Sequence, residues 1–240
     1  MIRPPRTQPR NDYPTSDGKP MAETDLHRRL MNEVIESLIW WFRDRPDVYV
    51  SGNLMVFYEK GNKRIHVAPD AFVVPGIGNH PRENYLLWQE GRGLDFVVEL
   101  TSKTTMMEDI ETKYNLYVEK LAVKEYVLFD PREEYLTPSF QMYRRFGPGF
   151  RNVKPTNGRF TSRVLGLELE RHGTDLRFRD PATGELLPTP TERANAEARR
   201  AQAEADRAHA EAERADTAEA EVARLRRELA RLRGERNGGG

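Results

Sequence analysis

The sequence predicts an α/β protein with a mixed sheet flanked by helices and a long helical tail. Two short apolar runs, at 96–100 and 126–129, flank a helical segment at 107–121, which is the pattern of a crossover between parallel strands. Shorter apolar runs separated by turn residues favour antiparallel hairpins in the same domain. From residue 191 the chain is mostly Ala, Glu and Arg without any aromatic residue, which predicts one long helix and no further core.

Composition supports a single core with polar appendages. The chain has 240 residues, of which 38% are hydrophobic and 32% are charged, so part of it is too polar to pack a core. Lys plus Arg and Asp plus Glu number 38 each, which gives a formal net charge of zero. Any basic surface for a nucleic acid must therefore be local.

The sequence contains no cysteine, no recognisable signal peptide and no membrane-spanning run, and these features limit the expected chemistry and location. There is no cysteine, which excludes disulfides, thiolate zinc sites and a cysteine nucleophile, and fits a reducing compartment. The amino-terminal residues lack the apolar stretch of a signal peptide, and no run approaches the length of a membrane span. We therefore expect a cytoplasmic protein that does not enter a membrane.

The first elements follow from local signals. Residues 1–21 are rich in Pro, Arg, Asn and Asp, which predicts a disordered arm. Thr24 is a plausible N-cap for a helix that runs through Trp41 and ends before Arg45-Pro46. Its apolar residues at helical spacing are Leu26, Leu30, Val34 and Leu38.

The remaining elements of the domain are mostly strands. Short β-rich runs bounded by turn residues predict strands at 48–50, 54–58, 65–67, 71–74, 96–100, 126–129, 141–146 and 165–169. A hairpin is expected at 176–187, turning at 180–184. The globular domain should thus span residues 22–188.

The tail carries a heptad pattern. Its seam consists of Ala194, Ala198, Ala201, Ala205, Ala208, Ala212 and Ala215, and after a slip it continues as Val222, Leu225, Leu229 and Leu232. Alanine buries little surface, so only the last leucines could hold a partner well. We expect a coiled-coil-like helix over 191–234 and a flexible end over 235–240.

Three features of the middle segment point to chemistry. Asp70 follows Pro69 at the start of a strand, Glu99 is the only charge in an apolar strand, and Lys103 and Lys113 come next. A carboxylate inside a buried strand costs several kcal/mol unless it is paired. A hard divalent cation shared by two carboxylates meets that need, and a lysine can stabilise charge on a phosphate. Taken singly, Asp70 could be a turn residue, Glu99 could form a buried ion pair, and the lysines could be solvent-exposed.

The order Pro-Asp, then Glu at the end of an apolar strand, then lysine resembles the PD-(D/E)xK nuclease superfamily. Two longer stretches, HVAPDAFVV at 66–74 and DFVVELTSKTTMMEDIETKYNLYVEKLAVKEYVLFDP at 95–131, are similar to the Uma-two family of restriction-endonuclease proteins. The matching positions in the second stretch are Glu99, Ser102, Thr105, Asp109, Lys113, Tyr117, 123–126 and Asp130-Pro131. The likeness covers roughly residues 22–188.

The resemblance implies a restriction-endonuclease-like fold and a metal-dependent nuclease. The metal ligands would be Asp70, Glu99 and Leu100, and the cofactor would be Mg²⁺ or Mn²⁺. In the superfamily pattern the lysine stands two residues after the glutamate, where this chain has Thr101. The family takes its lysine from the next helix, which favours Lys113 as the catalytic lysine, with Lys103 as the other candidate.

Helical spacing supports Lys113, because Asp109, Lys113 and Tyr117 are spaced by four residues and therefore share one helix face. The family's usual amino-terminal hairpin is absent from this sequence, so an acidic residue of the first helix, such as Glu33, could replace one contributed there.

The leading hypothesis is a Mg²⁺-dependent endonuclease acting on nucleic acid, with DNA as the expected substrate. An inactive nuclease-fold protein that binds DNA or protein is the alternative, favoured by Thr101. An adaptor that recruits a partner through its helical tail is the third. Adjacent Trp40 and Trp41 point about 100° apart on a helix, so one of them could mark an exposed patch, and we expect a homodimer formed chiefly by the globular domain.

Overall fold

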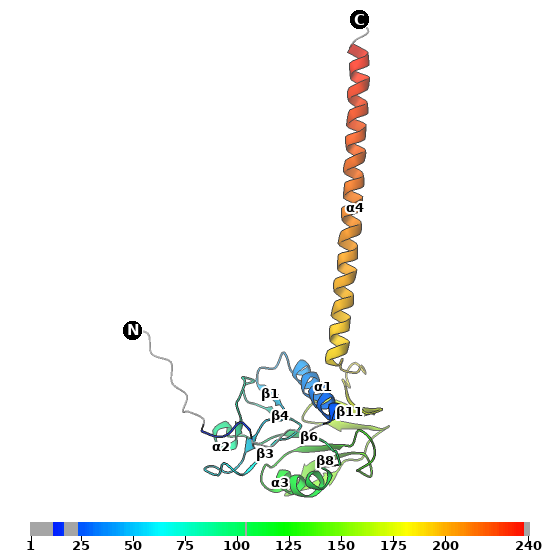
Figure 1. Ribbon diagram of the computed structural model, residues 1–240. Helices are drawn as coiled ribbons and strands as arrows, with labels where there is room; N and C mark the ends of the chain where they lie inside the picture. Colours follow the sequence, from blue (N-terminus) through cyan, green and yellow to red (C-terminus); the bar gives the residue numbers. More distant parts are fainter. Residues whose placement is uncertain (1–11, 17–23, 104, 238–240) are drawn as a thin grey trace, which may run out of the picture. The chain divides into compact units, whose positions relative to one another are not determined.

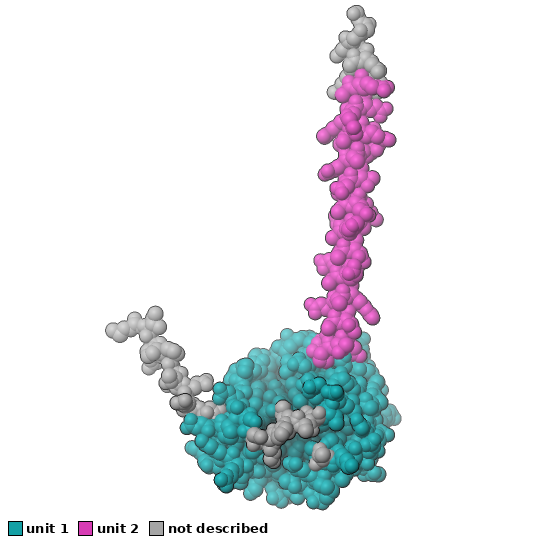
Figure 2. Space-filling view, viewed as in Figure 1, with its two compact units in different colours: residues 1–189 teal, residues 190–240 magenta. Residues whose placement is uncertain are grey.

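The computed structural model describes residues 12–16, 24–103 and 105–237, with side chains up to residue 231. The chain divides into two compact units, Met1–Thr189 and Pro190–Gly240, which are coloured separately in Figure 2. Most of the predicted arm, all of 238–240 and the side chain of Leu232 lie outside the described residues.

A six-stranded mixed sheet forms the centre of the first unit (Figure 1). Its strands, in spatial order, are β1 (Val48–Ser51), β4 (Ala71–Pro75), β6 (Phe96–Leu100), β7 (Glu125–Phe129), β8 (Phe140–Phe146) and β9 (Gly149–Asn152). Only β6 and β7 pair in parallel within this sheet, and the other neighbours are antiparallel. The predicted α/β class, mixed sheet and crossover are confirmed.

The crossover from β6 to β7 begins with an unexpected helix type. The sequence predicts one α-helix from 107 to 121, whereas the chain forms a π-helix, η1 (Glu108–Lys113), followed by α3 (Tyr114–Glu119). A π-turn bonds each N–H five residues back and widens the helix. In this widened segment Asp109 and Lys113 are both buried.

One face of the sheet is covered by α1 (Asp25–Trp41) and by a second sheet. The side chain of Thr24 accepts a hydrogen bond from the backbone N–H of His27, which confirms the predicted N-cap. The apolar face of α1 packs on β4 and β6 through Leu30, Val34 and Leu38.

The tryptophans of α1 also belong to this core. Trp40 and Trp41 are both half-buried against it, and the Trp41 indole donates to the carbonyl of Leu165 at 3.0 Å. They therefore give no support to an exposed tryptophan patch, and the homodimer stays a prediction.

The second sheet comprises β10 (Arg159–Ser162), β11 (Leu167–His172) and β12 (Asp175–Arg179). β12 pairs with β11 along its length, a partner that the sequence did not predict. The hairpin predicted at 176–187 is also present, because the N–H of Leu187 donates to the carbonyl of Phe178, the N–H of Asp180 donates to the carbonyl of Glu185, and Arg179 forms a bridge with Leu186. Leu169 and Phe178 of the second sheet complete the core.

The opposite face carries α3 and a small sheet. This sheet has the order β3 (His66–Val67), β2 (Val56–Phe57) and β5 (Tyr85–Leu86), and α2 (Leu87–Glu90) follows it. Within the predicted arm, the described residue Tyr13 packs its ring on Phe57 at 4.9 Å and on Trp88 at 5.1 Å between centroids.

The second unit is the helix α4 (Pro190–Asn237), which agrees with the predicted helical tail. Apart from Pro190 and Arg193, its described side chains are exposed, including Val222, Leu225 and Leu229 of the predicted seam. Pairing of the seam stays a prediction. None of the helices in the described part of the chain has the length and apolar character needed to cross a bilayer.

Candidate functional site

The two predicted carboxylates lie on neighbouring strands. Asp70 immediately precedes β4, and Glu99 is the fourth residue of β6. The antiparallel register pairs Ala71 with Val98, so extending it by one residue sets Asp70 opposite Glu99. The backbone N–H of Leu100 donates to Oδ2 of Asp70 at 2.7 Å. Because the N–H and C=O of one strand residue point to the same edge, the Leu100 carbonyl also faces the Asp70 side.

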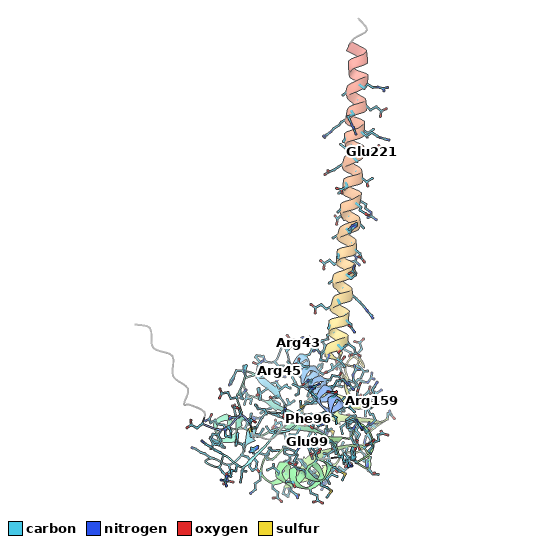
Figure 3. All side chains as sticks on the ribbon, in the orientation of Figure 1. Arg43, Arg45, Phe96, Glu99, Arg159 and Glu221 are labelled. Carbon is cyan, nitrogen blue, oxygen red and sulfur yellow. The ribbon has the colours of Figure 1, made fainter. Side chains whose placement is uncertain are left out.

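Glu99 is completely buried and pairs with residues from the crossover helices. Figure 3 shows Glu99 and Phe96, both on β6, within the body of the first unit. Lys113 Nζ donates to Oε2 of Glu99 at 2.8 Å, and the Tyr117 hydroxyl donates to Oε1 at 2.5 Å. Lys113 Nζ also lies 3.0 Å from Oδ1 of Asp109. The ammonium of Lys113 thus bridges two buried carboxylates.

Burial determines the protonation of this cluster. Loss of solvent raises the pKa of Glu99 to about 8, and the carboxylates of Asp70 and Asp109 add to the shift while Lys113 opposes it. Burial likewise raises the pKa of Asp109. For Lys113, burial alone would lower the pKa, but the surrounding carboxylates raise it overall, so Lys113 keeps its charge.

His27 is a member of the site that the sequence did not predict. It lies in the first turn of α1, is 8% exposed, and its Nε2 is 3.0 Å from Oδ1 of Asp70. Glu33 of the same helix, which we considered from the sequence, instead pairs with Arg29. A histidine in the turn after a good N-cap was the available signal, but nothing local assigns it to Asp70.

Gly52 fixes the approach of the chain to Asp70. A Cβ built on Gly52 would lie 2.0 Å from the carbonyl oxygen of Asp70, a distance that no side chain tolerates. The next residue, Asn53, donates its backbone N–H to the carbonyl of Pro69 at 2.7 Å. A glycine two residues after the strand predicted at 48–50 was the sequence signal for this close approach.

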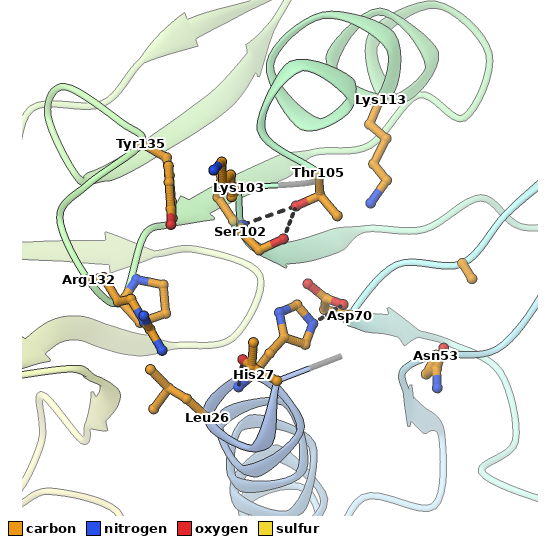
Figure 4. A pocket seen from close by; sticks show the side chains of 14 residues that line it. Leu26, His27, Asn53, Asp70, Ser102, Lys103, Thr105, Lys113, Arg132 and Tyr135 are labelled. Atoms are coloured by element: carbon orange, nitrogen blue, oxygen red, sulfur yellow. Dashed lines mark hydrogen bonds and ion pairs between the residues drawn. The ribbon is translucent and has the colours of Figure 1, made fainter. Parts of the chain in front are cut away.

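A cavity of about 350 Å³ opens beside these residues (Figure 4). Asp70, His27 and Lys113 reach it from three different elements, and Thr101 lines it with a buried hydroxyl that has no hydrogen-bond partner among the described residues. Lys103 also lines the cavity, but its side chain is exposed to solvent, whereas that of Lys113 is buried against carboxylates. Glu99 is not among the lining residues and lies behind Lys113.

The chemistry of the cluster fits a hard cation. When Asp70, Glu99 and Asp109 are all ionised, the single ammonium of Lys113 leaves two negative charges uncompensated in a buried place. A carboxylate offers about four lone-pair positions, so Glu99 retains acceptor capacity after its two hydrogen bonds. With the carbonyl of Leu100 the donors are all oxygen, as Mg²⁺ prefers.

The cluster does not, however, supply a complete set of side-chain ligands for a metal ion. Among the described residues, no three His, Cys, Asp or Glu side chains gather as a metal site. A cation held here would therefore depend on two carboxylates, a backbone carbonyl and water or substrate oxygens.

Comparison with known proteins gives a family match over most of the first unit. Residues 3–146 match the model of the Uma2 family, described as "Putative restriction endonuclease". The matched segment contains Asp70, Glu99 and Lys113, and it ends before β9, the second sheet and α4. No curated protein matches the chain.

Among solved structures, the chain is similar to a crystal structure from Anabaena variabilis described as a "putative nuclease belonging to DUF820". The two share 15% sequence identity over 61% of this chain and 76% of the other, with a TM-score of 0.44.

Proposed function

The chain belongs to the Uma2 family, described as "Putative restriction endonuclease", and we propose that it is a metal-dependent endonuclease that hydrolyses phosphodiester bonds in DNA. Mg²⁺, or Mn²⁺ in its place, is the proposed cofactor. Asp70, Glu99 and the Leu100 carbonyl would hold it, and Lys113 is the proposed catalytic lysine.

The observation that carries this proposal is the meeting of Asp70, Glu99 and Lys113. Asp70 and Glu99 come from adjacent strands, and Lys113 comes from the helix that follows β6. The lysine that the superfamily pattern places at position 101 has no counterpart there, since residue 101 is threonine. The ammonium of Lys113 reaches Glu99 from 14 residues further along the chain instead.

Each residue has a role that follows from its contacts. Asp70 is held at both oxygens, by the Leu100 N–H and by His27, so its carboxylate is preoriented towards the cavity. Lys113 lines the cavity and can donate to a non-bridging phosphate oxygen, where it stabilises charge that develops during attack by water. A bound divalent cation would polarise the phosphate and favour deprotonation of that water.

The second candidate is an inactive nuclease-fold protein that binds DNA or a protein partner, with α4 as a recruiting element. One observation favours it: both oxygens of Glu99 are already engaged, and the residue is shut away from the cavity. In this case the Glu99–Lys113 pair would be purely structural.

Cleavage separates these candidates. We would incubate the full chain with plasmid and with single-stranded DNA in Mg²⁺, Mn²⁺ or EDTA. The proposal expects metal-dependent nicking that Asp70→Ala abolishes and that Asp175→Ala, an acidic residue outside the cavity, leaves unchanged. Mn²⁺ binding, measured by electron paramagnetic resonance, gives a readout independent of turnover. Metal binding without cleavage, or neither, would support the inactive candidate.

We also propose a homodimer and a cytoplasmic location. A two-fold dimer would present two sites in related orientations, which suits cutting of both strands of a duplex. Sedimentation of the full chain and of a chain ending at Thr189 tests this. A dimer that survives truncation supports an interface on the first unit, a dimer lost on truncation assigns it to α4, and a monomer in both cases refutes dimerisation.

A further inference from the structure

Tyr135 lines two cavities at once. The first is the cavity that contains Asp70 and Lys113, and the second, of about 380 Å³, adjoins it. Figure 4 shows Tyr135 and Arg132 reaching towards the first cavity from the loop that follows β7. The ring of Tyr135 is therefore a shared wall between the candidate catalytic residues and a second space.

The loop that carries Tyr135 is built rigidly. The carboxylate of Asp130, which is 0% exposed, accepts backbone hydrogen bonds from Arg132, Glu133, Tyr135 and Leu136. Arg171 braces the same loop by donating to the carbonyl of Asp130 at 2.6 Å. A half-exposed aromatic ring on a loop fixed in this way is preorganised to receive a ligand, so binding orders little additional chain.

The second cavity has the lining of a site for a flat aromatic ligand. Its walls include Ile110, Tyr114, Leu136, Thr137, Gln141 and Tyr143. Ile110, an apolar residue of this wall, is 39% exposed. The Gln141 amide donates to the carbonyl of Pro138 and accepts from the Tyr143 hydroxyl, and it keeps one further donor and acceptor position.

The first cavity has the charges expected beside a phosphate chain. The exposed cations Lys103 and Arg132 line it together with Lys113. Arg132 and Tyr135 lie three residues apart on the same braced loop and both line the first cavity, so this loop brings a cation and an aromatic ring to it. Grooves that bind single-stranded nucleic acids combine these two features, a basic path for the backbone and rings on which bases stack.

We propose that the second cavity is a nucleobase pocket, in which an unpaired base stacks on Tyr135 while its phosphate lies in the first cavity near Asp70 and Lys113. This inference rests on the proposed function and specifies its substrate as a strand with an accessible base: single-stranded DNA, a flap, or a duplex at a position where a base is extruded. In a paired duplex the bases face inward and are stacked on one another, so no base reaches Tyr135 without unpairing.

Binding in EDTA tests the pocket independently of catalysis. Fluorescence anisotropy would compare three labelled ligands of equal length: single-stranded DNA, the same sequence as a duplex, and an abasic deoxyribose-phosphate oligomer. The full chain should bind the single strand about tenfold more tightly than the abasic oligomer, the order of one base–aromatic stack. Tyr135→Ala should bring that ratio close to one, whereas Tyr135→Phe should preserve it.

Phe146→Ala is the matched control, because this exposed ring lies outside both cavities. Circular dichroism would confirm that each variant is folded. Equal binding of the single strand and the abasic oligomer by the full chain, an unchanged ratio in Tyr135→Ala, or a duplex bound as tightly as the single strand would overturn the pocket. A base preference without cleavage in Mg²⁺ would leave the pocket standing and refute the proposed catalysis, and cleavage without base preference would do the reverse.

Discussion

Replacement of Lys113 by methionine tests the buried charge cluster most directly. Methionine keeps most of the volume and removes the ammonium, which leaves Glu99 and Asp109 without their shared cation. The side chains of both carboxylates are 1% exposed and that of Lys113 is 11% exposed. Breaking a buried pair by removing one partner costs roughly 3–5 kcal/mol because an uncompensated charge stays inside.

For a domain of this size that loss corresponds to a fall in Tm of roughly 6–20 °C. The matched control is Lys124→Met, since Lys124 pairs with Asp95 but its side chain is 56% exposed. An exposed pair contributes only about 0.2–1 kcal/mol, so its Tm should move by no more than a few degrees. Thermal unfolding of both variants, followed by circular dichroism, measures the difference.

The loss should depend on pH in a defined direction. A buried carboxyl whose pKa is raised binds a proton more tightly in the folded state, so the folded state loses stability as pH rises from the unfolded-state pKa to the folded-state pKa. The pKa of Glu99 is about 8 even beside Lys113. Below that pH Glu99 is protonated in the folded state with or without Lys113, so the deficit of Lys113→Met should be smallest towards pH 5 and grow as the pH rises through 8.

The same variant tests catalysis at a temperature where it is folded. Removing one donor that stabilises transition-state charge lowers turnover by on the order of 10² to 10³, whereas Lys103→Ala should have a smaller effect. A deficit that equals that of Lys124→Met, or that grows as the pH falls, would refute the electrostatic account of the cluster. Wild-type cleavage by a folded Lys113→Met would remove Lys113 from the chemistry.

Four other changes have defined outcomes. His27→Leu should weaken Mn²⁺ binding by about 10- to 100-fold through loss of the Asp70 contact, while His27→Gln restores part of it, as measured by electron paramagnetic resonance. Gly52→Ala should lower Tm and Mn²⁺ affinity together, because the added Cβ displaces Asp70; unchanged affinity would contradict that close approach. Arg179 and His172 lower the pKa of Glu170 to about 2. The ionised Glu170 therefore adds to the free energy of unfolding above its unfolded-state pKa, and this contribution is lost as the pH falls towards 2. In urea unfolding, the stability of Glu170→Gln should fall less steeply than that of the wild type over this acid range. Ending the chain at Thr189 should leave calorimetric unfolding of the first unit nearly unchanged, and a large loss of stability would show that α4 packs on its core.

Local signals in the sequence were sufficient for several elements. Alternation, capping and turn residues predicted α1 with its Thr24 cap, the crossover from β6 to β7, and the long helix α4. Each of these signals depends on residues within a few positions of one another, so it can be recognised in the sequence without the fold. The pairing of β12 with β11 and the π-turn of η1 were missed, because both depend on which surface each segment packs against.

Some residues of the candidate site were also indicated by the sequence, whereas others were found only in the structure. Glu99 drew attention in the sequence because a lone charge in an apolar strand requires a partner, and Asp70 stood out by its place after Pro69. Local patterns did not identify the partners of Glu99, since Lys113 and Tyr117 reach it from 14 and 18 residues away; the family resemblance singled out Lys113, and only the structure shows that both residues donate to Glu99. His27 lies 43 residues before Asp70, and Tyr135 is an ordinary loop residue until two cavities are seen to share it.

The sequence by itself determined which residues are apolar, that Glu99 is the charged residue within an apolar strand, and where several helices and strands begin. Only the tertiary structure decided which distant groups satisfy that charge, because pairing in a core depends on packing across strands and helices that no local pattern records. Burial of Glu99 links the sequence to the tertiary structure. A carboxylate removed from water requires partners, and the fold places Lys113 and Tyr117 within hydrogen-bond distance of it.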